Sequence, residues 1–193
     1  MAQLICFDVG NVLVRLKSFT HAVDKTKVEQ YSHLTQLYGV GRLARQEFLN
    51  ALRALFEWRC ELSDIESWFV HHRIEGPQPG SDKLLAQLHK SGVTVSLLSN
   101  TNASHWAYLS SLELFQPRLI SVLSFEQRCA KPDIEIYRRL EELTGFNSAE
   151  IIFFDDLEVN TLAADRLGWI TRQVAPPSAI DDIYKFLQGH GVL

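Results

Sequence analysis

The chain has 193 residues, 46% of them hydrophobic, which is enough to bury a sizeable core. Its formal net charge is -4, and its lysines and arginines are scattered, so we expect neither nucleic acid nor a membrane as a partner. Three widely spaced cysteines, Cys6, Cys60 and Cys129, indicate no disulfide framework, and we expect a reduced, cytoplasmic setting.

Five short apolar runs rich in β-branched or aromatic residues alternate with segments of helical period. The runs are residues 4–7, 93–98, 119–123, 151–154 and 169–174. Apolar residues spaced at i, i+3 and i+4 predict helices at 82–90, 133–145, 160–168 and 178–191. This alternation is typical of an α/β fold in which a doubly wound parallel sheet is flanked by helices.

The stretch between the first two runs is roughly twice as long as one crossover helix requires. From residue 18 to about residue 74 it shows no strand-like alternation, but it has amphipathic segments at 28–38, 45–58 and 64–72. The turn-rich residues 75–80 are expected at its exit. We therefore predict a core of residues 1–16 and 78–193, with a small helical subdomain of residues 17–77 inserted after the first strand.

Four of the predicted strands are followed by side chains that can do chemistry. They are Asp8 after the first run, Ser99 and Asn100 after the second, Lys131 in the loop after the third, and Asp155 and Asp156 after the fourth. Each set alone is typical of helix caps, turns or solvated loops. Because the carboxyl ends of parallel strands open into one crevice, we predict that the sets form a single site.

Phosphoryl transfer through a covalent aspartyl intermediate needs this combination of groups. Asp8 is the predicted nucleophile, and Mg²⁺, held by Asp8 and one of the pair Asp155 and Asp156, would offset its repulsion from an anionic substrate. Lys131 would hold the nucleophile and one phosphoryl oxygen by charge. The Ser99 hydroxyl, together with the Asn100 side chain or its backbone N–H, would bind another oxygen at a helix N-terminus.

Four short motifs follow one another along the chain: FDVGNVL (7–13), LLSNTN (97–102), KPD (131–133) and FFDDLEVN (153–160). In their sequence and order they resemble the motifs of haloacid dehalogenase (HAD) superfamily hydrolases. The resemblance implies a Rossmann-like core and a C1-type helical cap that closes over the site and selects the substrate. Within the superfamily, the motifs most resemble the branch of small sugar-phosphate phosphatases that includes α-glucose-1-phosphate phosphatases. The resemblance to HAD hydrolases also implies that the backbone carbonyl of Gly10 coordinates Mg²⁺.

Gly10 departs from the family pattern, which usually has a second acid at this position to protonate the leaving group and then to activate water. A positioned general acid/base typically contributes ~10² to 10⁴ in rate. We therefore expect reduced or specialised catalysis, because the glycine keeps the carbonyl and lacks the acid. His105 or a metal-bound water could substitute, although a structural role in its helix is the more ordinary interpretation of His105.

The favoured prediction is a Mg²⁺-dependent phosphatase that acts on a small phosphorylated metabolite, with a sugar phosphate favoured by the resemblance. Two alternatives stay open. One is a catalytically degenerate HAD protein that binds a phosphorylated ligand or a protein partner. The other is a HAD hydrolase of different chemistry such as a dehalogenase, but that branch resembles Asp-x-Tyr-Gly-Thr and needs no metal, so the pair Asp155 and Asp156 argues against it.

Substrate selection is expected in the cap, where the sequence singles out no residue. The candidates are Arg42, Arg45, Arg53, Arg59, Trp58, Trp68, His71 and His72. Arginines on amphipathic helices usually lie on solvated faces, and the tryptophans fit the core of the cap. The oligomeric state is not indicated by the sequence.

Overall fold

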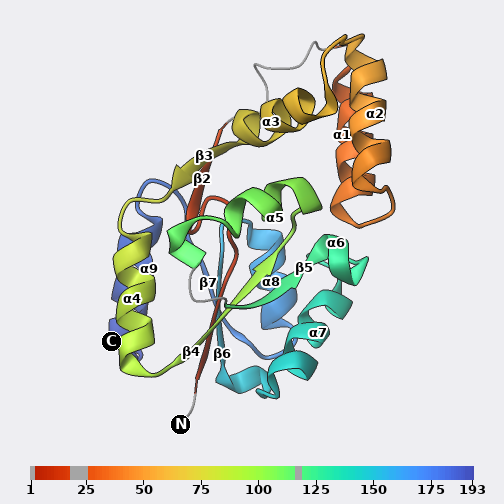
Figure 1. Ribbon diagram of the computed structural model, residues 1–193. Coiled ribbons are helices and arrows are strands. Elements are labelled where there is room, and N and C mark those ends of the chain that lie inside the picture. Colours follow the sequence, from red (N-terminus) through yellow and green to blue (C-terminus); the bar gives the residue numbers. More distant parts are fainter. Residues whose placement is uncertain (1–2, 18–25, 116–118) are drawn as a thin grey trace.

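The strand that precedes Asp8 lies at the centre of the sheet. The computed structural model describes residues 3–17, 26–115 and 119–193 and has five parallel strands in the order β5-β4-β1-β6-β7 (Figure 1). They are β1 (Leu4–Phe7), β4 (Thr94–Ser99), β5 (Ile120–Leu123), β6 (Ile151–Asp155) and β7 (Ile170–Gln173). Each strand coincides with a predicted apolar run, which confirms the doubly wound α/β core.

Successive side chains of β1 point to opposite faces of the sheet, and helices cover both faces. Ile5 and Phe7 belong to the cluster formed with α4 (Ser81–Ser91) and α9 (Ala179–Gly189). Leu4 and Cys6 belong to the cluster formed with α7 (Ile134–Thr144) and α8 (Glu158–Asp165). Figure 1 shows these two pairs of helices on opposite sides of the sheet. Burial on both faces explains why β1 is apolar throughout, without the alternation of a half-exposed strand.

Three helices lie between β2 (Val14–Leu16) and β3 (Ile74–Pro77) and have a small core of their own. They are α1 (Val28–Gly39), α2 (Arg45–Phe56) and α3 (Leu62–Arg73), and each falls on a predicted amphipathic segment. Their core is aromatic: the Tyr38 and Phe48 rings stack with centroids 4.3 Å apart, and Phe69 meets Phe48 edge-on at 4.8 Å. Figure 1 shows the three helices beyond the carboxyl ends of the sheet.

A two-stranded ribbon connects these helices to the core, and the sequence prediction missed it. The strands β2 (Val14–Leu16) and β3 (Ile74–Pro77) pair antiparallel, with a register shift between Arg15 and Leu16. The expectation of a turn and hinge from residue 75 is therefore wrong for residues 75–77. The strand is short, contains glycine and proline, and forms only because it pairs with residues some 60 positions away, so its sequence carries no local strand signal.

The inserted helices also contact two short helices of the core, α5 (Ala103–Leu109) and α6 (Ser124–Gln127). The hydroxyl of Tyr38 lies 2.7 Å from Oγ of Ser104, which donates a hydrogen bond of 2.6 Å to Glu66. The hydroxyl of Ser124 lies 2.6 Å from the carbonyl oxygen of Gly39. These hydrogen bonds fix the inserted helices beside the loop that follows β4. Two single-turn 3-10 helices, Glu113–Phe115 and Ser148–Glu150, complete the described elements.

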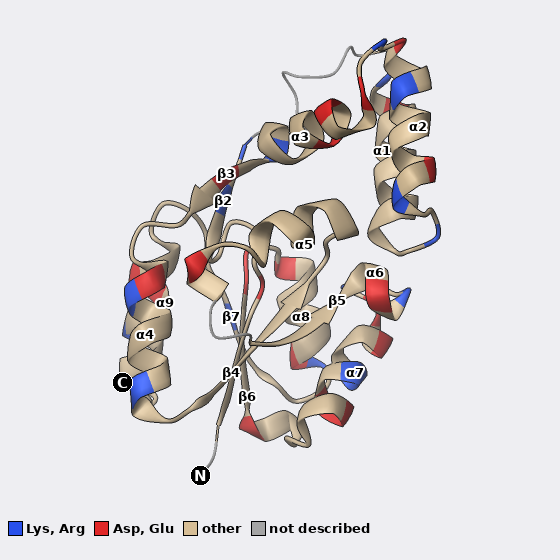
Figure 2. Ribbon diagram, in the orientation of Figure 1, with Lys and Arg blue, Asp and Glu red and all other residues tan. Residues whose placement is uncertain are grey.

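Figure 2 shows lysine, arginine, aspartate and glutamate residues distributed over the helices, with both signs present on α2, α4 and α7. Within the described part of the chain, no helix combines the length and the apolar character that crossing a membrane requires.

Candidate active site

The predicted site residues that follow β1 and β6 are brought together by the register of the sheet. Phe7 of β1 pairs with Phe154 of β6, and the N–H of Asp8 donates a 2.8 Å hydrogen bond to the carbonyl oxygen of Phe154. Asp8 and Asp155 therefore leave adjacent strands at the same level. On the other side of β1, Phe7 pairs with Leu97, which places the end of β4 and Ser99 at the same edge.

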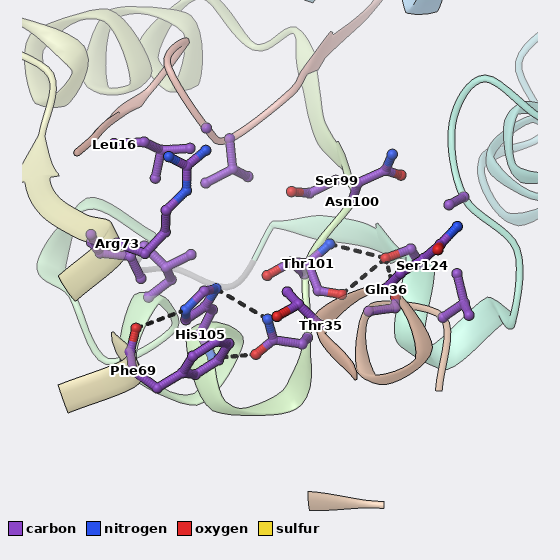
Figure 3. Close-up of a pocket in the computed structure, with 18 of the residues that line it drawn as sticks. Leu16, Thr35, Gln36, Phe69, Arg73, Ser99, Asn100, Thr101, His105 and Ser124 are labelled. Atoms are coloured by element: carbon purple, nitrogen blue, oxygen red, sulfur yellow. Dashed lines mark hydrogen bonds between the residues drawn. The ribbon is translucent and has the colours of Figure 1, made fainter. Parts of the chain in front are cut away.

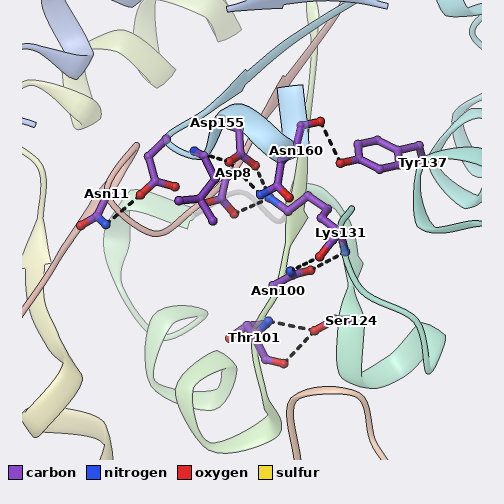
Figure 4. A network of polar contacts seen from close by, with 11 residues as sticks. Asp8, Asn11, Asn100, Thr101, Ser124, Lys131, Tyr137, Asp155 and Asn160 are labelled. Atoms are coloured by element: carbon purple, nitrogen blue, oxygen red, sulfur yellow. Dashed lines mark hydrogen bonds and ion pairs between the residues drawn. The ribbon is translucent and has the colours of Figure 1, made fainter. Parts of the chain in front are cut away.

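Lys131 joins the two carboxylates into one buried cluster. Its Nζ lies 2.8 Å from Oδ1 of Asp8 and 2.6 Å from Oδ2 of Asp155, and the Lys131 side chain is 1% exposed (Figure 4). Burial alone would lower the pKa of Lys131, but the charges of Asp8 and Asp155 outweigh it and raise that pKa. The lysine therefore stays cationic at neutral pH and offsets part of the negative charge of the site.

Asp8 is held in an environment that opposes its ionisation. Burial raises the pKa of Asp8 to about 6, against the lowering effect of Lys131, and the negative charge of Asp155 raises it further. The hydrogen bond from Lys131 is made to Oδ1, and no hydrogen bond from the described residues reaches Oδ2. The second oxygen is thus available to a ligand or to a reacting atom.

The two acids of the pair Asp155 and Asp156 have different surroundings. Oδ1 of Asp155 accepts hydrogen bonds of 2.9 Å from the backbone N–H of Leu157 and from the Asn160 side chain, and Oδ2 is held by Lys131. Both oxygens of Asp155 are therefore hydrogen-bonded, and the residue is fully buried. Asp156 is half-buried and accepts only one side-chain hydrogen bond within the described chain, from Asn11 to Oδ2.

Asn11 is a site residue that the sequence prediction missed. Its Nδ2 donates a 2.9 Å hydrogen bond to Oδ2 of Asp156, and its backbone adopts a positive φ of 56°. Asparagine tolerates this left-handed conformation better than most residues. A Gly-Asn pair directly after the predicted nucleophile was the available signal, and it is equally typical of an ordinary turn.

Three carboxylates converge in a way that suits a divalent cation. Asp8, Asp155 and Asp156 each offer an oxygen, and these oxygens all lie within 4.8 Å of one another. Hard oxygen donors at this density are what Mg²⁺ binds in proteins. Ion binding would also relieve the burial of negative charge that a single lysine leaves uncompensated.

The side-chain amide of Asn100 makes two hydrogen bonds to the backbone of Lys131. Oδ1 of Asn100 accepts a 2.8 Å hydrogen bond from the backbone N–H of Lys131, and Nδ2 donates a 2.8 Å hydrogen bond to the carbonyl oxygen of Lys131. The amide therefore holds the lysine loop. The second N–H of Nδ2 and the backbone N–H of Asn100 take no part in these two bonds, so either could donate to a phosphoryl oxygen.

A cavity of about 500 Å³ leads from these strand ends to the inserted helices. Gly10, Ser99 and Asn100 line its core side, and residues of α1 and α3 line its other side. Figure 3 shows Ser99 and Asn100 across the cavity from Leu16 and Arg73. A small molecule in the cavity would thus contact both the strand ends and the inserted helices.

A family model described as haloacid dehalogenase-like hydrolase matches residues 2–168. The chain belongs to this family. The solved structures that it resembles include the HAD family enzyme BT-2542 from Bacteroides thetaiotaomicron, with 23% identity over 93% of this chain and 98% of that one and a TM-score of 0.78. The same enzyme in complex with magnesium and inorganic phosphate has 22% identity over 92% and 96% of the two chains, with a TM-score of 0.73.

Two further structures extend the comparison. The solved structure of a predicted HAD-like family hydrolase from Porphyromonas gingivalis has a TM-score of 0.81. Its sequence is 22% identical over 97% of this chain and 98% of that one. The L-2-haloacid dehalogenase from Xanthobacter autotrophicus has 20% identity over 90% and 78% of the two chains, with a TM-score of 0.59. At these identities the likeness shows a shared HAD-like fold.

Gly10 distinguishes this HAD-like hydrolase from the usual first motif of the family, and Leu16 fills the space beside it. A Cβ built on Gly10 would lie 2.6 Å from Cδ1 of Leu16 and 3.9 Å from Oδ2 of Asp8. A side chain at residue 10 would therefore begin close to the Asp8 carboxylate, and the Leu16 side chain would have to move to make room for it. The site has an apolar group where the family usually has an acid.

His105 is not placed as a replacement for that acid. Its Nδ1 lies 3.1 Å from Nδ2 of Asn102 and its Nε2 lies 3.3 Å from the carbonyl oxygen of Phe69, so both ring nitrogens are engaged. Burial lowers the pKa of His105 to about 4. The imidazole is neutral at pH 7 and stacks on the Phe69 ring at 4.4 Å, which supports the structural interpretation.

Proposed function

We propose that this HAD-like hydrolase is a Mg²⁺-dependent phosphatase that removes the phosphoryl group from a small phosphorylated metabolite, with sugar phosphates as the favoured class, through an aspartyl-phosphate intermediate. The observation that carries the proposal is the buried contact of Lys131 with both Asp8 and Asp155, beside the less saturated Asp156. The magnesium and phosphate complex of the Bacteroides enzyme supports it by analogy of fold.

The carboxylate atoms that remain available indicate how the residues would share their roles. Asp8, through Oδ2, and Asp156 would hold Mg²⁺ together with the carbonyl of Gly10, whereas Asp155 is occupied by Lys131, Leu157 and Asn160. Asp155 would then act mainly by positioning Lys131, and its contact with the metal would be the weaker one. When bound, Mg²⁺ would supply positive charge that neutralises the nucleophile and the phosphoryl oxygens.

In the first step, a carboxylate oxygen of Asp8 would attack phosphorus, and the bond from phosphorus to the ester oxygen would break. Lys131 fixes the orientation of Asp8 and offsets its charge. The Ser99 hydroxyl and the Asn100 backbone N–H would donate hydrogen bonds to the phosphoryl oxygens. In the second step, water would attack the phosphorus of the aspartyl phosphate, which restores the Asp8 carboxylate and releases inorganic phosphate.

The proton that the leaving oxygen requires has no side-chain donor at residue 10. Solvent would supply it, which predicts slow turnover of esters with poor leaving groups. The same feature favours the second candidate function, a degenerate HAD protein that binds a phosphorylated ligand without hydrolysing it. Both candidate functions require binding of a phosphorylated ligand, but only the phosphatase hydrolyses it.

Phosphate release from a panel of sugar phosphates, with Mg²⁺ and with EDTA, tests the proposal. We expect release of inorganic phosphate that requires Mg²⁺ and is lost in the Asp8→Asn variant. If inorganic phosphate or its fluoride analogues bind while no substrate gives turnover that depends on both Mg²⁺ and Asp8, the phosphatase proposal fails and the binding protein stands.

A further inference from the structure

The cavity between the strand ends and the inserted helices contains one permanently charged side chain. Among the described residues that line it, Arg73 is the single arginine or lysine, and aspartate and glutamate do not occur. His105 also lines the cavity but is neutral at pH 7, since burial lowers its pKa to about 4. Arg73 is therefore the one positive group that the described lining offers to an anionic part of a ligand.

The guanidinium of Arg73 has N–H donors that make no hydrogen bond to the described residues. It is the last residue of α3 and is half-buried, and its Nη1 donates a 2.5 Å hydrogen bond to the carbonyl oxygen of Lys17. Within the described chain, no carboxylate lies within 4 Å of its guanidinium, in contrast to Arg45, which pairs with Glu66. A guanidinium carries five N–H donors, and within the described part of the chain the contact with Lys17 uses one of them.

The surroundings of Arg73 make an unpaired charge costly. Burial lowers the pKa of Arg73, against the attraction of Tyr31 and Asp156. A partly desolvated cation without a close carboxylate is stabilised when an anionic ligand reaches it, and a guanidinium matches the geometry of carboxylate and phosphate.

Arg73 lies across the cavity from Ser99 and Asn100, the two residues that would donate hydrogen bonds to the reacting phosphoryl group. Figure 3 shows Arg73 and Leu16 on one side of the cavity and Ser99 and Asn100 on the other. Phe69 of α3 lies on the same side as Arg73, and α1 adds Ser32, Thr35 and Gln36 to the lining of the cavity. The part of a substrate beside these residues would be its leaving group.

We propose that Arg73 is a specificity-determining residue that binds a second anionic group, a carboxylate or a phosphate, on the leaving group of the substrate. This inference rests on the proposed phosphatase function and narrows its substrate class. The enzyme would then prefer phosphorylated sugar acids or sugar bisphosphates to sugar monophosphates whose leaving group is neutral.

Pairs of substrates that differ only in the second anion test the proposal. Glucose 1-phosphate is compared with glucuronic acid 1-phosphate, in which a carboxylate replaces the C6 hydroxymethyl group, and fructose 6-phosphate with fructose 1,6-bisphosphate, which adds a phosphate. A charge-assisted hydrogen bond predicts that kcat/KM is about 10- to 100-fold higher for at least one anionic member. The two pairs distinguish a carboxylate from a phosphate as the preferred second group.

Variants of Arg73 separate recognition from a structural role. Arg73→Gln should erase the preference by raising KM for the anionic member, and Arg73→Lys should retain part of it. Arg53→Gln is the matched control, because Arg53 is an exposed cap arginine that does not line the cavity, and it should leave the preference unchanged. Equal losses for both members of each pair would show that Arg73 serves only to hold the chain at Lys17 and would overturn the inference.

If the protein shows no turnover, the affinity for the same compounds tests the role of Arg73. Calorimetric titration of the Asp8→Asn variant with the same four compounds, with and without Arg73→Gln, should show tighter binding of an anionic member that depends on Arg73. Equal affinities within both pairs would overturn the inference whether or not the protein is a phosphatase. Absence of turnover with Arg73-dependent binding would instead contradict the proposed function alone.

Discussion

Leu16 occupies the position that a side chain on Gly10 would need, with its Cδ1 2.6 Å from the Cβ that any other residue would have there. The contact is made by the end of a flexible side chain, and Gly10 does not have the left-handed backbone that excludes larger residues. An acid at residue 10 therefore requires the Leu16 side chain to move, and a smaller residue at position 16 would make room for it.

The first prediction is that Gly10→Asp alone gives little gain, whereas Gly10→Asp combined with Leu16→Ala raises kcat. The added carboxylate would point toward Asp8 and could protonate the leaving group, and the expected gain is about 10- to 100-fold, below the full value of a positioned acid. Steady-state phosphate release with a sugar phosphate measures it. Leu16→Ala alone is the control, and a double variant no faster than this control would show that the acid is not what limits turnover.

The strand ends of the site were predictable because each group follows its strand directly. Asp8, Ser99 and Asp155 need only a parallel sheet to be brought together, and the apolar runs indicate that sheet. Lys131 lies farther along its loop, but its place before Pro132 at the start of a helix was a usable signal.

The cavity side of the site was not predictable, because it depends on how the inserted helices sit on the core. The arginines proposed from the sequence, Arg42, Arg45, Arg53 and Arg59, are all exposed and do not line the cavity. Arg73 lies one residue beyond the predicted helical segment 64–72 and was not considered. Its four-residue spacing from Phe69 places both on one face of α3, but only the tertiary structure shows that this face meets the cavity.

The second prediction concerns Lys131, whose removal would leave two buried carboxylates facing each other. Lys131→Met should lower the free energy of unfolding by about 3–5 kcal/mol at pH 7.5, as expected when one partner of a buried ion pair is lost. The loss should be smaller at pH 5, because protonation of Asp8, whose pKa is about 6, removes the repulsion. Urea unfolding in EDTA at both pH values measures this, with Lys83→Met on the exposed face of α4 as the control. A loss that does not depend on pH would show that packing, and not charge, explains the effect.

The third prediction is that Asp8→Asn stabilises the metal-free protein. The folded-state pKa of Asp8 is about 6, above its ordinary value of 3.8, so the ionised carboxylate destabilises the fold at neutral pH. The variant should be more stable by about 1–3 kcal/mol above pH 6. The difference should shrink as the pH falls from 6 toward 4, because the wild-type carboxyl becomes protonated in the folded state.

Thermal unfolding in EDTA between pH 4 and pH 8 measures this difference, and it corresponds to a shift in Tm of about 2–10 °C. Asp165→Asn, at the end of α8 and exposed, is the control for an unspecific effect of lost charge. A variant less stable than wild type throughout this range would show that Asp8 is held favourably as a carboxylate, contrary to the raised pKa.

The fourth prediction assigns Asn11 to the metal site through Asp156. Asn11→Gly removes the hydrogen bond to Oδ2 of Asp156 but tolerates the positive φ of this position, so it tests the contact without adding backbone strain. Because groups that orient a ligand typically change metal affinity by about 10- to 100-fold, Mg²⁺ should bind more weakly by a factor near the lower end of that range. Calorimetric titration with MgCl₂ at pH 7.5 measures the affinity, and Asn50→Gly on α2 controls for a general loss of stability. Unchanged affinity in Asn11→Gly would mean that Asp156 does not depend on this contact, or is not the acid that holds the ion, and the same titration of Asp155→Asn and Asp156→Asn decides between these two explanations.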